Sequence, residues 1–209
     1  MLLPQLKPLH ISHSNSGLNL NSDLAIIVID EVDIEKGNIK SAELQKLDSE
    51  FGGTISDLIS FGDFEGKWLQ TSTSISSVQK NAKRILLLGA GKKQNYNAAR
   101  ARQLGIKSAE ISLATKSNSV LFYSYSCLLS SKELVVQSSL GFNMGMYKYP
   151  NSNMKPEAIQ ENEKAIQLNY INSISGCKEA LNEAKYIEES INVCRLLQDA
   201  PPNIGTPKY

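Results

Sequence analysis

The 209 residues are 41% hydrophobic and 21% charged, and the formal net charge is +1. This composition is that of a globular protein and excludes a disordered chain, while the length suits one domain or one domain with an appendage. The near-neutral charge gives no electrostatic reason to expect nucleic acid or an acidic membrane as a partner. The longest uninterrupted apolar run, LAIIVI, is far too short to span a membrane.

The three cysteines, Cys127, Cys177 and Cys194, are odd in number and widely spaced, and no C-x-x-C pair occurs. They predict small buried side chains in a reducing compartment, the cytoplasm, and not a disulfide framework or a structural zinc site. The opening MLLPQLKPLHI lacks the charged start and continuous apolar stretch of a signal peptide. We therefore expect residues 1–20 to be a tail or an edge segment.

Strands and helices alternate along the chain. Residues 24–30 (LAIIVID) are a short apolar run that ends in charge and predict a buried strand, and residues 40–47 predict a short helix. Residues 57–75 hold two turn signals, Gly62-Asp63 and Glu65-Gly66, which predict strands joined by a tight turn.

The clearest unit is a strand over residues 84–88 that enters a turn at Gly89-Ala90-Gly91. A helix over 95–115 is expected to follow, with Asn95 or Asn97 as its cap. The remaining predicted elements are a strand at 119–126, a helix at 130–149 that begins near Ser131, a half-buried strand at 163–171 and a helix at 176–198.

This order predicts a three-layer α/β fold with a mixed, mostly parallel sheet flanked by helices. We place the α/β domain at residues 21–175, with a loop at 151–157, and the final helix at 176–198. A single apolar stripe is expected to attach this helix to the domain. Its members are Ala180, Ala184, Ile187, Ile191 and Cys194.

A glycine turn between a strand and a helix can present main-chain N–H groups to an anion. Gly89, Ala90, Gly91 and Lys92 are therefore a candidate phosphate loop. However, a Walker loop needs Ser or Thr after its lysine, whereas Lys93 stands there, and the third glycine of the dinucleotide fingerprint is Gln94. A plain turn with positive φ at Gly89 or Gly91 is the competing interpretation.

Other polar groups offer weaker chemistry. His10 and His13 are expected to be an exposed, unstructured pair, because metal ligation needs a rigid support and more ligands. Cys127 lies in an apolar, uncharged context unlike that of a reactive thiol. Four carboxylates past the first strand could hold a hard cation, although a solvated charged turn is the commoner arrangement. They are Asp30, Glu31, Asp33 and Glu35.

Four segments follow one another along the chain: GDFEGKWLQT at 62–71, RILLLGAGKK at 84–93, SSLGFNMGMYKYPNSN at 138–153 and CRLLQDAPPNIGTPKY at 194–209. In this order they resemble the N-terminal domain of the leucyl aminopeptidase (cytosol aminopeptidase) family. The helix that ends at Tyr147 resembles a glycine-rich family segment, with Tyr149 in place of a phenylalanine.

The last segment is the most specific. The family carries Arg-x-Leu followed by Asn-x-Pro-x-Asn-x-x-x-Pro where its two domains join, and Asp199 departs from this pattern by replacing the first Asn. The matching residues are Arg195, Leu197, Pro201, Asn203 and Pro207.

The resemblance implies an N-terminal domain like the macro domain, a linker helix, and a catalytic domain that begins at residues 199–209. It implies no cofactor and no catalytic or metal-binding residue in this chain, since two divalent metal ions, zinc or manganese, belong to the catalytic domain. The implied partners are that domain and the other subunits of a homohexamer, and the parent enzyme releases N-terminal amino acids from peptides. We expect a non-catalytic domain that serves assembly or substrate access, with Leu196 and Leu197 partly exposed where the helix loses partners.

Two alternatives stay open. A stand-alone macro-like module would bind a nucleotide such as ADP-ribose at Gly89, Ala90 and Gly91. A DNA-binding accessory domain would use a basic bias between residues 80 and 107, where a solvated helix face and turn is the plainer interpretation. The basic residues are Lys80, Lys83, Arg84, Lys92, Lys93, Arg100, Arg102 and Lys107.

Overall fold

The computed structural model describes residues 6, 8–15, 20–76, 81–124, 131–148, 165–171 and 174–200. These residues form a six-stranded sheet in which five strands run parallel and one edge strand is antiparallel. In spatial order the strands are β1 (Leu9–Ser14), β8 (Ile166–Ile171), β7 (Ser119–Ser124), β2 (Ser22–Asp30), β6 (Ala82–Gly91) and the antiparallel β5 (Thr71–Ile75).

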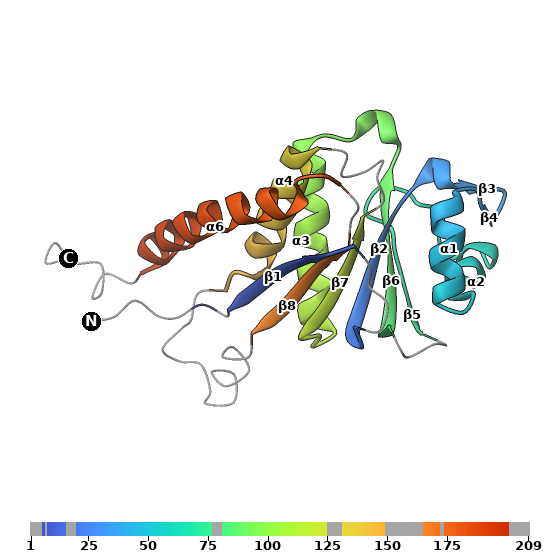
Figure 1. Cartoon of the computed structure of the whole chain (residues 1–209), viewed down its shortest axis with the longest axis horizontal. Coiled ribbons are helices and arrows are strands. Elements are labelled where there is room, and N and C mark those ends of the chain that lie inside the picture. Colours follow the sequence, from blue (N-terminus) through green and yellow to red (C-terminus); the bar gives the residue numbers. More distant parts are fainter. Residues whose placement is uncertain are drawn as a thin grey trace, which may run out of the picture.

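Helices cover both faces of this sheet (Figure 1). One face packs on α3 (Ala98–Ala114), α4 (Lys132–Met146) and α6 (Cys177–Asp199), and the other on α1 (Ala42–Glu50) and α2 (Thr54–Ser60). A small hairpin of β3 (Ile34–Glu35) and β4 (Asn38–Ile39) lies beside α2. The predicted three-layer α/β fold with a mixed, mostly parallel sheet is confirmed.

The core divides into two apolar clusters, one on each face of the sheet. Along β2, Leu24, Ile26 and Val28 belong to the cluster under α3, α4 and α6, whereas Ala25 and Ile27 belong to the cluster under α1 and α2. Because successive strand side chains point to opposite faces, a central strand must be apolar at every position. This explains why LAIIVI is uninterrupted, and the predicted buried strand is confirmed.

The half-buried strand predicted near residue 166 is also confirmed. Ile166, Leu168 and Tyr170 of β8 are buried, while Gln167 between them is exposed. The helix predicted after Gly91 is α3, and the cap is Asn97, whose side chain accepts a hydrogen bond from the Arg100 amide at 3.0 Å. Ser131 caps α4 in the same way, through the Leu134 amide.

The α3 and α4 helices approach each other so closely that glycine is required at their contact. A Cβ atom on Gly105 would lie 2.1 Å from the Ser138 carbonyl oxygen, and one on Gly141 would lie 2.0 Å from the Arg102 carbonyl oxygen. No side chain fits at such distances. The glycines of the 138–153 segment therefore serve helix packing.

Three local predictions are wrong. Residues 57–60 belong to α2 and not to a strand, because Ile55, Leu58 and Ile59 recur at helical spacing and pack on one face. His10 and His13 lie on β1, the edge strand of the main sheet, and are not an unstructured pair. Gly89 to Gly91 continue β6 and do not form a turn. The loop predicted at 151–157 lies outside the described residues.

Candidate interdomain face on the terminal helix

The glycines of the candidate phosphate loop are engaged by residues 63–70, which we call the strap. The Gly89 amide donates to the Gln70 carbonyl at 2.8 Å, and the Gly91 amide donates to the Gly66 carbonyl at 2.9 Å. A Cβ atom on Gly89 would lie 1.9 Å from the Lys67 carbonyl oxygen. Two main chains therefore meet here, and the absent side chains make room for the strap. Gly91 does adopt the positive φ, 71°, expected of one of these glycines.

A hollow beside these glycines lies at the carboxyl ends of β2 and β6. Its lining residues are Glu31, Val32, Lys92, Lys93 and Gln94. Burial raises the pKa of nearby Asp33, although a main-chain hydrogen bond and the charge of Lys93 oppose that rise. The hollow thus presents charges of both signs.

The predicted metal-ligand candidates do not converge. His10 and His13 are three residues apart on a strand, so their side chains point to opposite faces of the sheet. Asp30 ends β2 and is buried, whereas Glu35 is exposed and pairs with Lys40 at 3.6 Å. Within the described ranges, no three His, Cys, Asp or Glu side chains are placed to hold a metal ion. Cys127 and Lys80 lie outside those ranges.

The basic residues of 83–107 are spread over the fold. Lys83 and Arg84 begin β6, whereas Lys92 and Lys93 follow its far end, roughly 30 Å away at the rise of a strand. The other three are engaged by neighbouring side chains: Arg100 stacks on Trp68 at 4.4 Å, Arg102 donates to Gln137 at 2.8 Å, and Lys107 pairs with Glu110 at 3.5 Å. The described residues give no continuous basic stripe.

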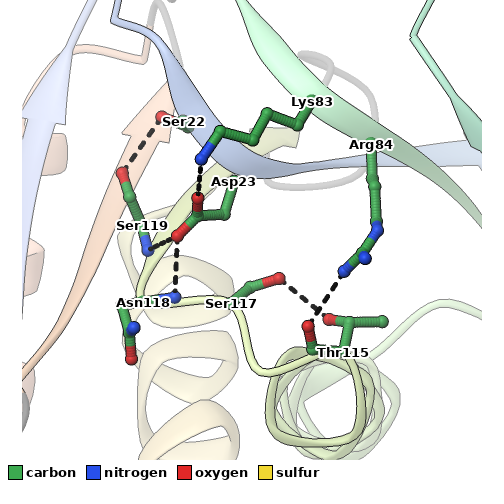
Figure 2. A network of polar contacts seen from close by, with 8 residues as sticks. All are labelled: Ser22, Asp23, Lys83, Arg84, Thr115, Ser117, Asn118 and Ser119. Atoms are coloured by element: carbon green, nitrogen blue, oxygen red, sulfur yellow. Dashed lines mark hydrogen bonds and ion pairs between the residues drawn. The ribbon is translucent and has the colours of Figure 1, made fainter.

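Figure 2 shows the polar network that engages Lys83 and Arg84 at the amino ends of the strands. The Asp23 carboxylate accepts from Lys83 Nζ at 2.7 Å and from the amides of Asn118 and Ser119 at 3.0 and 3.2 Å. Burial raises the pKa of Asp23, but these hydrogen bonds outweigh it and lower the pKa overall. Arg84 donates to the Thr115 carbonyl at 2.9 Å. The network ties β6 to the loop after α3.

The inner face of α6 attaches this helix to the domain. Ala180 and Ala184 are buried as predicted, but Ile187 is 37% exposed and Cys194 is exposed. Glu188 is buried instead of Ile187 and accepts a hydrogen bond from Ser139 Oγ of α4 at 2.7 Å. Burial raises the pKa of Glu188 to about 7, and the Ser139 hydrogen bond opposes that rise.

The last turn of α6 keeps partners, contrary to the prediction for residues beyond Cys194. The Arg195 guanidinium lies 5.1 Å from the centre of the Tyr147 ring, and the Tyr147 hydroxyl donates to Asp199 at 2.8 Å. Leu196 is buried, which also contradicts the prediction, whereas Leu197 is 57% exposed as predicted. Tyr147 follows α4 directly, so α4 holds the end of α6.

The outer face of α6 carries an apolar stripe that no described residue covers. Tyr186, Val193 and Leu197 are 71%, 49% and 57% exposed, and their spacings of seven and four residues place them in one line. They lie opposite the buried face of Ala184 and Glu188. We call Tyr186, Val193 and Leu197 the outer stripe. In Figure 1 the end of α6 extends beyond the strands.

Comparison with known proteins decides the family. Residues 27–156 match the cytosol aminopeptidase family, N-terminal domain. The chain belongs to this family. Among similar proteins, a probable cytosol aminopeptidase of Buchnera aphidicola is 31% identical over 170 residues, which are 78% of this chain and 33% of that protein. One from Nitrosococcus oceani is 24% identical over 209 residues, which are 94% of this chain and 40% of that protein.

Solved structures give the same fold. A tomato leucine aminopeptidase variant aligns with a TM-score of 0.75 and 22% identity, over 98% of this chain and 41% of that chain. The bottromycin maturation enzyme BotP aligns with a TM-score of 0.60 and 14% identity, over 90% of this chain and 35% of that one. This member of the cytosol aminopeptidase family thus spans about a third to two-fifths of the length of these relatives. No described helix is long and apolar enough to cross a membrane.

Two side-chain contacts could not be predicted from the sequence. The predicted apolar stripe of this helix does not include Glu188, because a buried carboxylate is recognisable only with its hydroxyl partner, Ser139, in place. Tyr147 was noted as part of a motif, but its pairing with Arg195 and Asp199 joins residues about 50 positions apart. The signal for the outer stripe, by contrast, was present in the spacing of Tyr186, Val193 and Leu197.

Proposed function

We propose that this chain is the non-catalytic N-terminal domain of a leucyl aminopeptidase-like metallopeptidase, and that it serves assembly or substrate access. The observation that carries the proposal is the outer stripe of α6 on a chain that matches about a third of its relatives' length. The parent enzyme would release N-terminal amino acids from peptides in the cytoplasm. Two divalent metal ions, zinc or manganese, would be held by the region of the relatives that this chain does not match.

The described residues do not supply a donor set for those ions. A bimetallic hydrolase needs fixed carboxylates that clamp two cations and activate water. In our proposal such chemistry belongs to the remainder of the parent enzyme, and this domain acts by contact with that remainder. We assign no catalytic role to its own residues.

The outer stripe fits the remainder of the polypeptide as its occupant. Burial of one leucine such as Leu197 is worth about 1.5–3 kcal/mol, so three apolar side chains in a line favour a packed neighbour over water. The stripe ends at the last turn of α6, where the chain would continue into the catalytic domain. A neighbouring domain of the same polypeptide is present at high effective concentration and needs no further recognition element.

The Tyr147 contacts make this junction stiff. Arg195 and Asp199 tie the final turn of α6 to the end of α4, so the last turn of α6 points in a fixed direction relative to the domain. A fixed direction would hold the domain at one position beside the active site. From that position it could limit which peptides enter, or contact further subunits of a homohexamer.

A chimera tests the proposal. This chain would replace the matched 170 residues of the Buchnera protein, and hydrolysis of leucine anilide with manganese would be measured. We expect the chimera to be active, Val193→Asp and Leu197→Asp to reduce activity or assembly at least about tenfold, and Asn182→Asp on the same helix to have no effect. The chain alone should show no turnover.

Two results would overturn the proposal. Chelator-sensitive turnover by the 209-residue chain alone would place a metal centre within it. Full activity and assembly of the chimera carrying both aspartates would show that the outer stripe does not contact the remainder. The melting temperature of each isolated variant separates loss of contact from loss of folding.

A further inference from the structure

The strand β5 is an edge strand that lacks the usual protection. It pairs with β6 through residues 71–75, TSTSI, and no described element pairs with its other edge. Natural edge strands are commonly blocked by lysine, proline, a bulge or a covering segment, since an open edge is a template for another strand. The β5 sequence contains no charge and no proline, and its Thr and Ile residues favour strand structure.

The ladder with β6 determines which main-chain groups face outward. Ser76 donates to the Lys83 carbonyl at 3.0 Å and Gly89 donates to the Gln70 carbonyl at 2.8 Å, so alternate residues from Gln70 to Ser76 bond to β6. Ser72 and Ser74 therefore point their N–H and C=O groups inward. Those of Thr71, Thr73 and Ile75 point away from β6, toward the open edge.

The side chains of the outward-bonding residues are exposed as well. Thr71 and Thr73 are exposed, and Ile75 is 74% exposed. All three lie opposite Leu88, Leu86 and Arg84 of β6 and share the face that carries α3. Ile75 is thus an apolar side chain that strand pairing at this edge would cover, and its burial would contribute to the free energy of association.

We propose that the β5 strands of two copies of this chain pair antiparallel across a twofold axis, with Thr73 opposite the Thr73 of the other copy. In this register Thr71 of each copy lies opposite Ile75 of its partner, and the outward groups form about six main-chain hydrogen bonds. Thr–Thr and Thr–Ile neighbours favour such a pair. The two sheets join into one continuous sheet.

The charges near β5 are compatible with this register. Arg84 lies opposite Ile75 within one copy. In the proposed dimer a row of cross-strand neighbours therefore runs from Arg84 and Ile75 of one copy to Thr71 and Leu88 of the other. Arg84 also donates to the Thr115 carbonyl, and Lys83 pairs with Asp23. The two copies of Arg84 therefore stand in different rows, and like charges do not oppose each other.

This pairing specifies how the domain would serve assembly. Its role in a larger particle rests on the proposed function. It does not depend on the outer stripe, which lies on α6, at the opposite edge of the sheet beside β1. A particle of the parent enzyme could therefore use both surfaces. One surface would join the domain to its own polypeptide, and the other would join two polypeptides.

The test is the mass of the 209-residue chain by sedimentation velocity over a wide concentration range, with Thr73→Pro and the matched Thr73→Val. Proline removes an N–H that faces away from β6, so the β5–β6 ladder survives. Valine keeps the N–H and the branched Cβ. We expect the parent chain and Thr73→Val to dimerise, and Thr73→Pro to dissociate at least about tenfold more readily with an unchanged melting temperature.

Several outcomes would overturn the pairing. A parent chain that stays monomeric throughout contradicts it, and so does a Thr73→Pro dimer as tight as that of the parent. A dimer that Leu197→Asp abolishes and Thr73→Pro does not would assign self-association to the outer stripe. If Thr73→Pro fails to fold, Thr73→Lys places a charge at the edge without altering the ladder and is read by the same criteria. The chimera with the Buchnera protein separately tests contact with the remainder of the enzyme.

Discussion

The helices α4 and α6 lie side by side on the same face of the sheet, but they are packed differently. Eight of the fifteen α4 residues are buried, because α4 lies between α3 and α6, whereas six of the twenty-three α6 residues are buried. The apolar residues of α4 are covered by its own domain, whereas α6 also exposes an apolar stripe on its outer face. A helix that is apolar on two faces thus indicates a second neighbour, and the position of its buried face decides which side that neighbour occupies.

The largest effect should separate the two faces of α6. Ala184→Asp would bury an unpaired charge against the domain and should lower the free energy of unfolding by about 4 kcal/mol. Leu197→Asp, on the outer stripe, should change it by less than about 0.5 kcal/mol. Urea denaturation of the isolated chain measures both. Similar losses at the two positions would mean that the outer stripe belongs to the core of the domain.

Glu188 makes the contact between α4 and α6 sensitive to pH. Its pKa is raised from 4.5 to about 7 in the folded protein. Between pH 4.5 and pH 7, folded Glu188 therefore keeps a proton that the unfolded chain has released. The stabilisation is complete below pH 4.5 and is lost as pH rises through 7. It amounts to roughly 3 kcal/mol, at about 1.4 kcal/mol per pKa unit.

Glu188→Gln should remove this dependence, because glutamine keeps a polar group near Ser139 without ionising. The difference in unfolding free energy between the variant and the parent should grow from pH 5 to pH 8 in favour of the variant. Glu183→Gln, at an exposed position of the same helix, is the control. If both variants follow the parent in parallel across this range, Glu188 does not titrate as its burial implies.

A smaller loss should follow a single added methyl group between α3 and α4. Gly141→Ala places a Cβ atom 2.0 Å from a main-chain oxygen and forces the helices apart, at a cost of about 2 kcal/mol. On α6, Asn182→Ala at an exposed site should be neutral or slightly stabilising. Thermal unfolding compares the two. An unchanged melting temperature for Gly141→Ala would show that the α3–α4 contact is looser than this distance implies.

The smallest effect concerns the end of α6. Tyr147→Phe deletes the hydroxyl that donates to Asp199 but keeps the ring under Arg195, so the loss of global stability should be below about 1 kcal/mol. Amide hydrogen exchange in the last turn of α6 should nevertheless accelerate. Tyr186→Phe, on the outer stripe of the same helix, should leave that exchange unchanged. Equal exchange in both variants would remove Tyr147 from its role at the junction.

Much of the fold could be predicted because its signals are local. LAIIVI specifies a strand buried on both faces, alternation around Leu168 specifies a half-buried one, and Asn97 and Ser131 mark helix starts. The prediction failed where a signal has two meanings. Glycines after a strand were interpreted as a turn, but Gly89 and Gly91 belong to β6 and bond to the strap, to Gln70 and Gly66, which lie 19 and 25 positions earlier in the chain.

Features of the molecule can likewise be divided into those that the sequence predicts and those that only the structure shows. The sequence by itself determined the alternation of strands and helices and the family, since both depend on the order and spacing of residues along the chain. The tertiary structure decided that Glu188 faces inward, that Tyr147 holds the end of α6, and that Thr71, Thr73 and Ile75 face an open edge. These facts depend on which distant segments meet, because a hydrogen bond or a strand ladder has no partner until the sheet has formed.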